Sequence, residues 1–256
     1  MKNILHFILG CLIIFSLYSC KQDTFDYADT GVLSFSDFSL NTSASVNEDY
    51  IIRIHGLSSE KINYESTYRE IKSVNDSKIT LNAGEYILEA RSSESVPDAS
   101  FETSLYGCSV PISIEYGKTT QLGELTCTLL QCAISIDYNE EFLKSVTGNG
   151  VASVEILSGQ SLNYPLTLSD DGTISFEKRT GYFSMGDAKS SSIIVTYRGY
   201  IDGHRLKMTT TMDEVKVGKH YTITLIKKNS VNDDPQFLFG IEDLISDDIL
   251  DNSQTE

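Results

Sequence analysis

Alternation of apolar and polar residues along most of the chain is the pattern that most restricts its fold. Tyr50, Ile52 and Ile54 alternate with Ile51, Arg53 and His55, and the same period of two recurs in residues 86–91 and 110–116. A period of two over five to seven residues places one set of side chains inward and the other outward. The pattern predicts a series of short β-strands.

The alternation continues through the second half of the chain without a long helical pattern between the strands. It is seen in residues 152–156, 164–168, 174–176, 193–197, 206–208 and 221–225. Asp171-Gly172 and Asp202-Gly203 predict tight hairpin turns, because these residues tolerate a positive φ. Short strands at this spacing predict an all-β protein of two antiparallel β-sandwich domains. The inward tyrosines Tyr86 and Tyr221, each at the start of a strand, resemble the closing strand of transthyretin-like or fimbrillin-like sandwiches, with an Ig-like sandwich as the alternative.

One run, LTCTLLQCAISIDY at 125–138, changes the parity of its apolar positions part-way along. Cys127 and Leu129 share one parity, whereas Cys132 and Ile134 share the other. A single straight strand cannot bury both sets on one face. We therefore expect a bulge, a turn or a switch between sheets near Leu129–Gln131, with both cysteines pointing inward.

The segment that follows this run suggests a division of the chain. Residues 140–146 favour a short helical turn, and Gly148-Asn149-Gly150 predicts a break. We place the N-terminal sandwich at 31–140 and the C-terminal sandwich at 141–229.

The last segment, 230–256, is an acidic tail without lysine or arginine. After Asp234-Pro235 its apolar residues are spaced by three and four, at Phe237, Ile241, Leu244, Ile245 and Ile249. This spacing predicts a short amphipathic helix. The helix would fold back onto the second sandwich; the alternatives are a disordered tail and a segment that docks on another subunit.

Residues 1–19 have the layout of a lipoprotein signal peptide. Lys2 precedes an apolar run from Ile4 to Leu17, which is short for a transmembrane helix. The run ends in Leu17-Tyr18-Ser19-Cys20, which resembles the lipobox read by bacterial lipoprotein signal peptidase. The resemblance implies that Cys20 becomes the first mature residue and carries acyl chains such as palmitate. The alternative is an ordinary secretory signal.

The lipid anchor at Cys20 sets the expected location. Residues 20–30 would form a tether, and Lys21-Gln22-Asp23 is similar to the surface-export signals of Bacteroidetes lipoproteins. We expect a lipid-anchored protein of the outer membrane that faces the medium, with the periplasmic leaflet as the alternative. Two acyl chains suffice for stable anchoring, and no later segment has the ~20 apolar residues of a transmembrane helix.

The charge balance argues against nucleic acid as a partner. The chain has a formal net charge of −16, whereas proteins that bind nucleic acid present basic surfaces. The same charge repels anionic lipid headgroups, so the acyl chains rather than the protein surface would hold the membrane.

Three segments together carry a family resemblance: GVLSFSDFSL at 31–40, LNAGEYILEARS at 81–92 and YGCSVPISIEYGKTTQLGELTCTLLQCAISIDY at 106–138. They resemble the Bacteroidetes lipoprotein family known as domain of unknown function 4493, over residues 31–140 and more weakly to about 228. The resemblance implies a surface or secreted β-sandwich protein, with a looser likeness to fimbrillin-type pilus and anchor proteins. It assigns no catalytic or binding residues.

The number of cysteines allows one disulfide bond in the mature chain. Cys11 leaves with the signal and Cys20 is lipidated, so Cys108, Cys127 and Cys132 remain. An odd number permits at most one internal disulfide, for which Cys108 and Cys127 are the candidates. The preferred alternative is three buried thiols that act as small hydrophobes. In the family's strand a cysteine often stands where Cys127 does.

Catalytic and metal-binding patterns are missing from the sequence. His55, His204 and His220 lie in or beside predicted strands without the spacing of a catalytic or metal motif, so we expect surface or edge-strand residues. Asp170-Asp171-Gly172 is too short for a calcium loop, although a calcium site built from distant loops stays open. We expect no enzyme, no cofactor and no resident metal.

Tyrosines are the remaining candidates for a binding site. Five lie in predicted loops or strand ends, where they would form platforms for a sugar: Tyr64, Tyr68, Tyr106, Tyr182 and Tyr200. The preferred alternative is that they fill the rims of the sandwiches. We expect a surface protein of adhesion or fimbrial-type assembly with pilin-like partners; the alternative is a glycan-binding accessory protein of a nutrient-uptake system.

Overall fold

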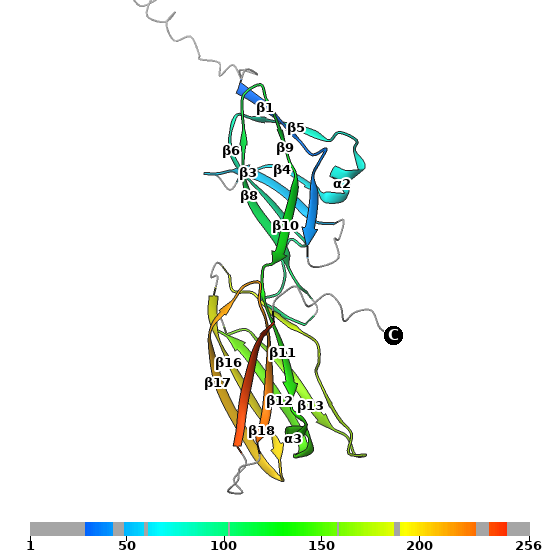
Figure 1. Cartoon of the computed structure of the whole chain (residues 1–256), viewed down its shortest axis with the longest axis vertical. Coiled ribbons are helices and arrows are strands. Elements are labelled where there is room, and N and C mark those ends of the chain that lie inside the picture. Colours follow the sequence, from blue (N-terminus) through cyan, green and yellow to red (C-terminus); the bar gives the residue numbers. More distant parts are fainter. Residues whose placement is uncertain are drawn as a thin grey trace, which may run out of the picture.

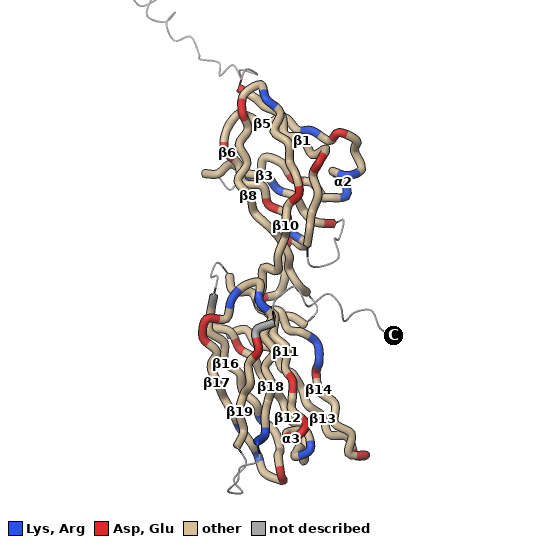
Figure 2. The backbone as a smooth tube through the Cα atoms, in the orientation of Figure 1, with Lys and Arg blue, Asp and Glu red and all other residues tan. Residues whose placement is uncertain are grey.

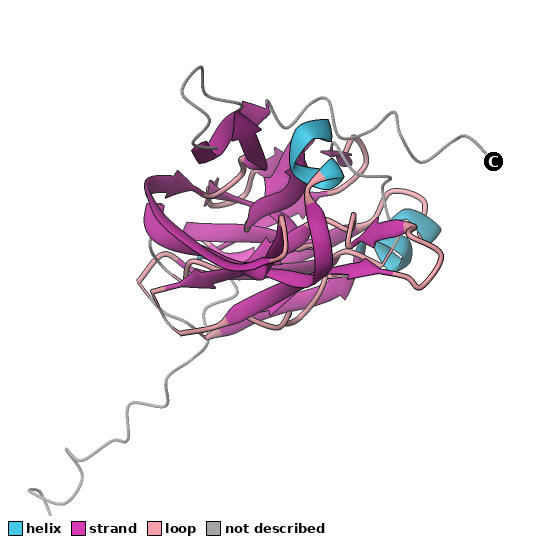
Figure 3. Ribbon diagram, turned by 90° about the horizontal axis from the view of Figure 1, so that it is seen from below, coloured by secondary structure: helices cyan, strands magenta, loops and turns pink. Residues whose placement is uncertain are grey.

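The computed structural model describes residues 29–42, 49–58, 61–101, 103–157, 159–186, 190–228 and 236–244. These residues form an all-β structure of two lobes that lie end to end (Figure 1). Figure 3, at right angles to that view, shows how strands dominate the described residues, with only short helices beside them. The predicted signal peptide at 1–19, Cys20 and most of the tether lie outside the described residues.

The first lobe contains two sheets around one hydrophobic core. The sheets have the orders β5-β1-β9 and β2-β10-β8-β6-β3-β4. Their strands are β1 (Thr30–Ser34), β2 (Ser39–Thr42), β3 (Ile51–Gly56), β4 (Ile62–Thr67), β5 (Lys78–Asn82), β6 (Gly84–Arg91), β8 (Tyr106–Ile114), β9 (Thr119–Gln121) and β10 (Glu124–Leu129). Inward residues of both sheets, such as Leu33 and Leu88, share the core. Helix α2 (Tyr68–Ser73) begins at a Thr67–Glu70 capping box.

The second lobe repeats this plan with two five-stranded sheets, in the orders β19-β18-β11-β15-β7 and β14-β13-β12-β16-β17. Its strands are β7 (Ala99–Ser100), β11 (Cys132–Tyr138), β12 (Val146–Ile156), β13 (Ser161–Leu168), β14 (Ile174–Phe176), β15 (Gly181–Phe183), β16 (Ser190–Ile201), β17 (His204–Lys216), β18 (His220–Lys228) and β19 (Gln236–Leu244). Helix α3 (Glu140–Lys144), predicted as a helical turn, inserts Phe142 into the second core.

The chain changes lobes between β10 and β11, which confirms the predicted switch near Leu129–Gln131. Cys127 is buried in the first core and Cys132 in the second. Gln131 joins the lobes: its side-chain Oε1 accepts a hydrogen bond from Leu105 N (2.7 Å) and its carbonyl accepts one from Gly218 N (2.9 Å). The change of core therefore falls at the start of β11, where Cys132 packs in the second core and Ala133 still packs in the first.

The segment after Asp234-Pro235, expected to be helical, is a strand. Strand β19 pairs antiparallel with β18 from Gln236↔Lys228 to Leu244↔His220. The prediction was wrong because the same segment contains a Phe-x-Phe alternation. Phe237 and Phe239 pack against the second core, and the edge of β18 provides backbone partners for the strand. The rest of the tail, residues 230–235 and 245–256, lies outside the described residues.

Two smaller expectations about strands were also wrong. Gly148-Asn149-Gly150, expected to be a break, lies inside β12, where the register against β16 shifts as in a β-bulge. Pairing is not wholly antiparallel, because β1–β9, β2–β10 and β11–β18 are parallel pairs. Parallel pairing arises where the chain crosses to the opposite sheet before it returns beside an earlier strand.

Candidate ligand-binding surface

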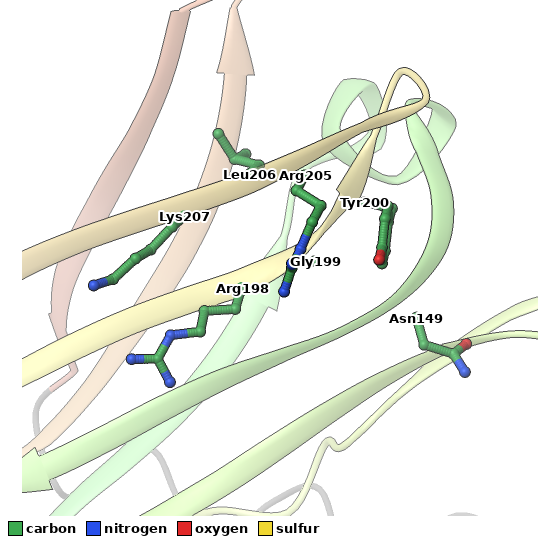
Figure 4. Close-up of a pocket in the computed structure, with 7 residues that line it drawn as sticks. All are labelled: Asn149, Arg198, Gly199, Tyr200, Arg205, Leu206 and Lys207. Atoms are coloured by element: carbon green, nitrogen blue, oxygen red, sulfur yellow. The ribbon is translucent and has the colours of Figure 1, made fainter.

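A shallow pocket lies on the outer face of the β16–β17 hairpin in the second lobe. It has a volume of about 390 Å³ and is lined by Asn149, Arg198, Gly199, Tyr200, Arg205, Leu206 and Lys207. Figure 4 shows the side chains of Arg198, Arg205 and Lys207 extending from the two neighbouring strands, with Tyr200 beside them. We call the group Arg198, Tyr200, Arg205 and Lys207 the cationic cluster.

The cationic cluster forms because side chains alternate between the two faces of a strand. In β16, Tyr197 and Ile201 point into the core, so Arg198 and Tyr200 point outward. The turn at Asp202-Gly203 has the positive φ angles predicted for it, 50° and 80°. It pairs Tyr200 with Arg205 and Arg198 with Lys207 across the two strands. Four side chains from two strands therefore share one small surface.

The charges of the cluster have the same sign. Arg198 and Lys207 stand directly opposite each other, an arrangement that destabilises a sheet unless another charge compensates. Among the described residues, neither of them nor Arg205 has a hydrogen bond or ion pair through its side chain. Charged positions of both signs are spread along the two lobes (Figure 2), yet no aspartate or glutamate lines this pocket.

The neighbouring residues hold the surface in shape. Gly148 lies under Tyr200, where a Cβ would be 3.1 Å from the Tyr200 Cβ. Tyr200 is 45% exposed, so one side of it faces solvent. The Oδ1 of Asn149 accepts a hydrogen bond from Leu168 N (2.9 Å), which orients the amide and leaves its NH₂ group as a donor. The pocket thus combines cations, an amide donor and an aromatic ring.

This combination is suited to binding an anion. Guanidinium groups bind carboxylate, sulfate or phosphate through paired hydrogen bonds, and a tyrosine ring provides an apolar platform with a polar tip. The seven lining residues include no carboxylic acid that would repel such an anion.

The structure separates the five tyrosines that were candidates for ligand contact. Tyr200 lies in the cationic cluster. Tyr64 and Tyr68 are partly buried against the first core, with ring centroids 5.8 Å from Phe35 and 5.5 Å from Phe38 respectively. Tyr106 is only 9% exposed and belongs to the first core, and Tyr182 packs against that core from β15. Four of the five therefore do not form an exposed platform.

Cysteine and metal positions can also be located. Cys108 and Cys127 lie opposite each other in β8 and β10, whereas Cys132 is buried in the second core. Within the described ranges, histidine, cysteine and acidic residues never gather in a group of three or more that would hold a metal ion. No helix in the described part of the chain is long and apolar enough to cross a membrane.

His220 is buried, contrary to the expectation that all three histidines lie at the surface or a sheet edge. Its Nε2 is 2.9 Å from the Ser135 hydroxyl, which is 3.0 Å from the hydroxyl of Thr180. The buried Nδ1 has no hydrogen-bond partner within the described residues. Neutral imidazole with the proton on Nε2 fits this environment, and burial lowers the pKa of His220 below its usual 6.5.

We expect the protein to lose stability as the pH falls below 6.5. In that range the unfolded state binds a proton at His220 more readily than the folded state, so protonation favours unfolding. The loss of stability begins near the pKa that His220 has in the unfolded state. It is complete once the pH is below the lowered pKa that His220 has in the folded state. Urea unfolding at pH 7.5, 6.5 and 5.5 measures it, and a His220→Gln variant should show a flatter dependence on pH. An unchanged dependence in the variant would assign the effect to other groups.

A family model described as "Domain of unknown function (DUF4493)" matches residues 27–251. No curated protein sequence matches.

Solved structures of low sequence identity are similar to this chain. One is from Bacteroides eggerthii, a protein proposed to act in cell adhesion: 9% identity, TM-score 0.45, 84% of this chain and 96% of that chain covered. Another is a proposed adhesin from Bacteroides thetaiotaomicron, with 10% identity, TM-score 0.45 and the same coverage of 84% and 96%. A third, from the same species, is a proposed polysaccharide-binding protein: 10% identity, TM-score 0.43, 76% and 92% covered.

Proposed function

The chain belongs to the family of the domain of unknown function DUF4493, and we propose that it is a non-enzymatic adhesion protein of the cell surface. In this proposal the cationic cluster holds an acidic glycan, a sugar polymer that carries carboxylate or sulfate groups. The observation that carries the proposal is the directly opposed pair Arg198 and Lys207, exposed beside Tyr200 without an acidic partner among the described residues.

Display at the surface is the mechanism we propose. Cys20 would carry the lipid anchor in the outer membrane, and residues 20–28 would lead to β1 at the start of the first lobe. Each lobe would be a β-sandwich domain, the first ending at about residue 130 and the second including β19. The two lobes lie end to end (Figure 1), and the cationic cluster is in the lobe that follows the anchored one.

The acidic glycan is favoured over a neutral one by charge. With a net charge of −16 the protein as a whole repels a polyanion, so attraction depends on a local group of cations. Arginine and lysine provide donors for carboxylate or sulfate oxygens. The exposed Tyr200 ring offers the flat apolar surface that a sugar ring needs.

We expect an Arg198→Gln/Lys207→Gln variant to bind an acidic polysaccharide at least tenfold more weakly than the native protein. Hydrogen bonds to charged groups contribute about 1.5–3 kcal/mol each, and 1.4 kcal/mol is a factor of ten. Chondroitin sulfate and polygalacturonate would be immobilised as probes, with dextran as the neutral comparison. Binding is measured by surface plasmon resonance at two salt concentrations, and it should weaken as salt rises.

A Lys216→Gln/Lys228→Gln variant is the matched control. Both lysines are exposed and outside the pocket, and their replacement changes the net charge by the same amount. The control should bind as the native protein does. An equal loss in both variants, or equal binding of dextran, would contradict a glycan site at the cationic cluster.

Assembly with pilin-like subunits is the second candidate function, and one observation favours it. The edge strand β19 exposes Leu238 and Ile241, which are 40% and 46% accessible. An exposed sheet edge with apolar residues is a surface on which another strand can pair. Cross-linking on intact native cells distinguishes the two: a ladder of pilin-like subunits supports assembly, whereas recovery of an acidic polysaccharide supports the glycan site.

A further inference from the structure

Cys108 and Cys127 form a closely spaced pair of thiols in the first lobe. The two strands β8 and β10 are paired at Gly107↔Thr128 and Tyr106↔Leu129, so the next opposed positions are Cys108 and Cys127. Their sulfur atoms are 2.9 Å apart. Opposed residues of antiparallel strands have Cα atoms about 4.5–5.5 Å apart, which falls within the range of a disulfide. We propose that Cys108 and Cys127 are joined by a disulfide in the exported protein.

The two thiols differ in a way that sets the order of reaction. Cys108 is half-buried, whereas Cys127 is buried. The hydrogen bond from Cys127 lowers the pKa of Cys108, and the same contact raises the pKa of Cys127. Cys108 is therefore the thiol that is both accessible and more readily deprotonated, which are the properties of an attacking thiolate.

The oxidant we assign is a disulfide-bonded protein or small molecule outside the cytoplasm. The Cys108 thiolate attacks one sulfur of that disulfide, forms a mixed disulfide and releases one thiol. The Cys127 thiolate then attacks the sulfur of Cys108 and releases the second thiol. Two protein thiols are oxidised to one disulfide, and the external disulfide is reduced to two thiols.

The position of the pair gives the bond a structural role. Between Cys108 and Cys127 the chain leaves the six-stranded sheet, contributes β9 to the opposite sheet beside β1, and returns as β10. The ladder between β8 and β10 consists of only two residue pairs. The disulfide would close the base of this excursion and hold β10 to β8 just before the chain crosses into the second lobe.

Cys132 serves as an internal reference for the test. It is fully buried in the second core, and its thiol donates to the carbonyl of Ala133 at 3.8 Å. It belongs to the other lobe and stands opposite Phe183 of β15 rather than another cysteine. We therefore assign the disulfide to the other two residues alone.

Peptide mapping of the full chain tests the assignment. The reduced protein is treated with oxidised glutathione, denatured, alkylated and cut with trypsin, which cleaves after Arg91, Lys118 and Lys144. We expect peptide 92–118 disulfide-linked to peptide 119–144, with a single alkyl group at Cys132. Alkylation of Cys108 and Cys127, or a link through Cys132, would overturn the proposal.

Thermal unfolding gives an independent readout. Closing a loop of this length stabilises a protein enough to raise its Tm by about 5–10 °C, so reduction with dithiothreitol should lower the Tm by that amount. A Cys108→Ala/Cys127→Ala variant should not respond to the reductant, whereas Cys132→Ala should respond as the native protein does. A native protein whose Tm is the same with and without reductant after glutathione treatment would contradict the structural role.

Discussion

Replacing Phe142 by alanine is expected to lower the free energy of unfolding of the second lobe by about 3–5 kcal/mol. Phe142 is fully buried, and its ring centroid lies 5.4 Å from that of Tyr138, 5.2 Å from that of Tyr197 and 6.0 Å from that of Phe237. These partners come from three different strands, so they cannot close together over the cavity. The short helix α3 would lose its only buried side chain.

Hydrogen exchange and urea unfolding measure this effect. Protection from exchange should fall in β11, β16 and β18, which surround the second core. It should not fall in β3 and β6, which surround the first core. Tyr116→Ala is the control, since Tyr116 is 64% exposed and its loss should change stability by less than about 0.5 kcal/mol. Equal loss of protection in both lobes would mean that the two cores unfold as one unit.

Gly199→Ala is expected to destabilise the second lobe by about 2–3 kcal/mol and to weaken ligand binding at the cationic cluster. A Cβ at this position would overlap the hydroxyl of Tyr197 and lie 2.7 Å from its Cζ and 3.0 Å from the Gly150 Cα. The Tyr197 ring is fully buried and cannot move aside. The strand must therefore shift, and Arg198 and Tyr200 flank the shifted residue.

Tyr197→Phe should recover part of the stability lost in Gly199→Ala. The Tyr197 hydroxyl is buried without a hydrogen-bond partner among the described residues, so its removal alone should be neutral or stabilising. A double-mutant cycle on the urea midpoints measures the coupling. Gly123→Ala is the control, because nothing lies within 4 Å of the added Cβ. Complete additivity would mean that the clash is with Gly150 and not with the hydroxyl.

Much of the fold could be predicted because strands with one buried face have a regular pattern. The parity change between Cys127 and Cys132 located the switch between lobes, since burial on both sides of the switch needs opposite faces. The tail was mispredicted because a few apolar residues fit both a helical face and a strand face. The segment forms a strand rather than a helix because the edge of β18 is available for pairing, which the local sequence does not show.

Tyr200 was predicted as a candidate contact, but the three cations beside it were missed, although the sequence contained the information. A two-residue turn at Asp202-Gly203 pairs residues at equal distances on either side of it, which brings Arg198 opposite Lys207 and Tyr200 opposite Arg205. The turn alone therefore determines which residues face each other across the two strands. The burial of Tyr106 and Tyr182 could not be predicted from the sequence in this way. The two residues meet at the junction between the lobes, and they come from strands of different lobes.

The place of β1 determines how the molecule would respond to a pulling force. A protein anchored before β1 and loaded at the β16–β17 hairpin would transmit tension along β1 into the rest of the first lobe. This strand is the central one of its sheet, with β5 on one side and β9 on the other. The pull acts along the strand, across the direction of its backbone hydrogen bonds. Those bonds would have to break together in shear, so the attachment between anchor and ligand should resist sudden flow better than a strand peeled from a sheet edge.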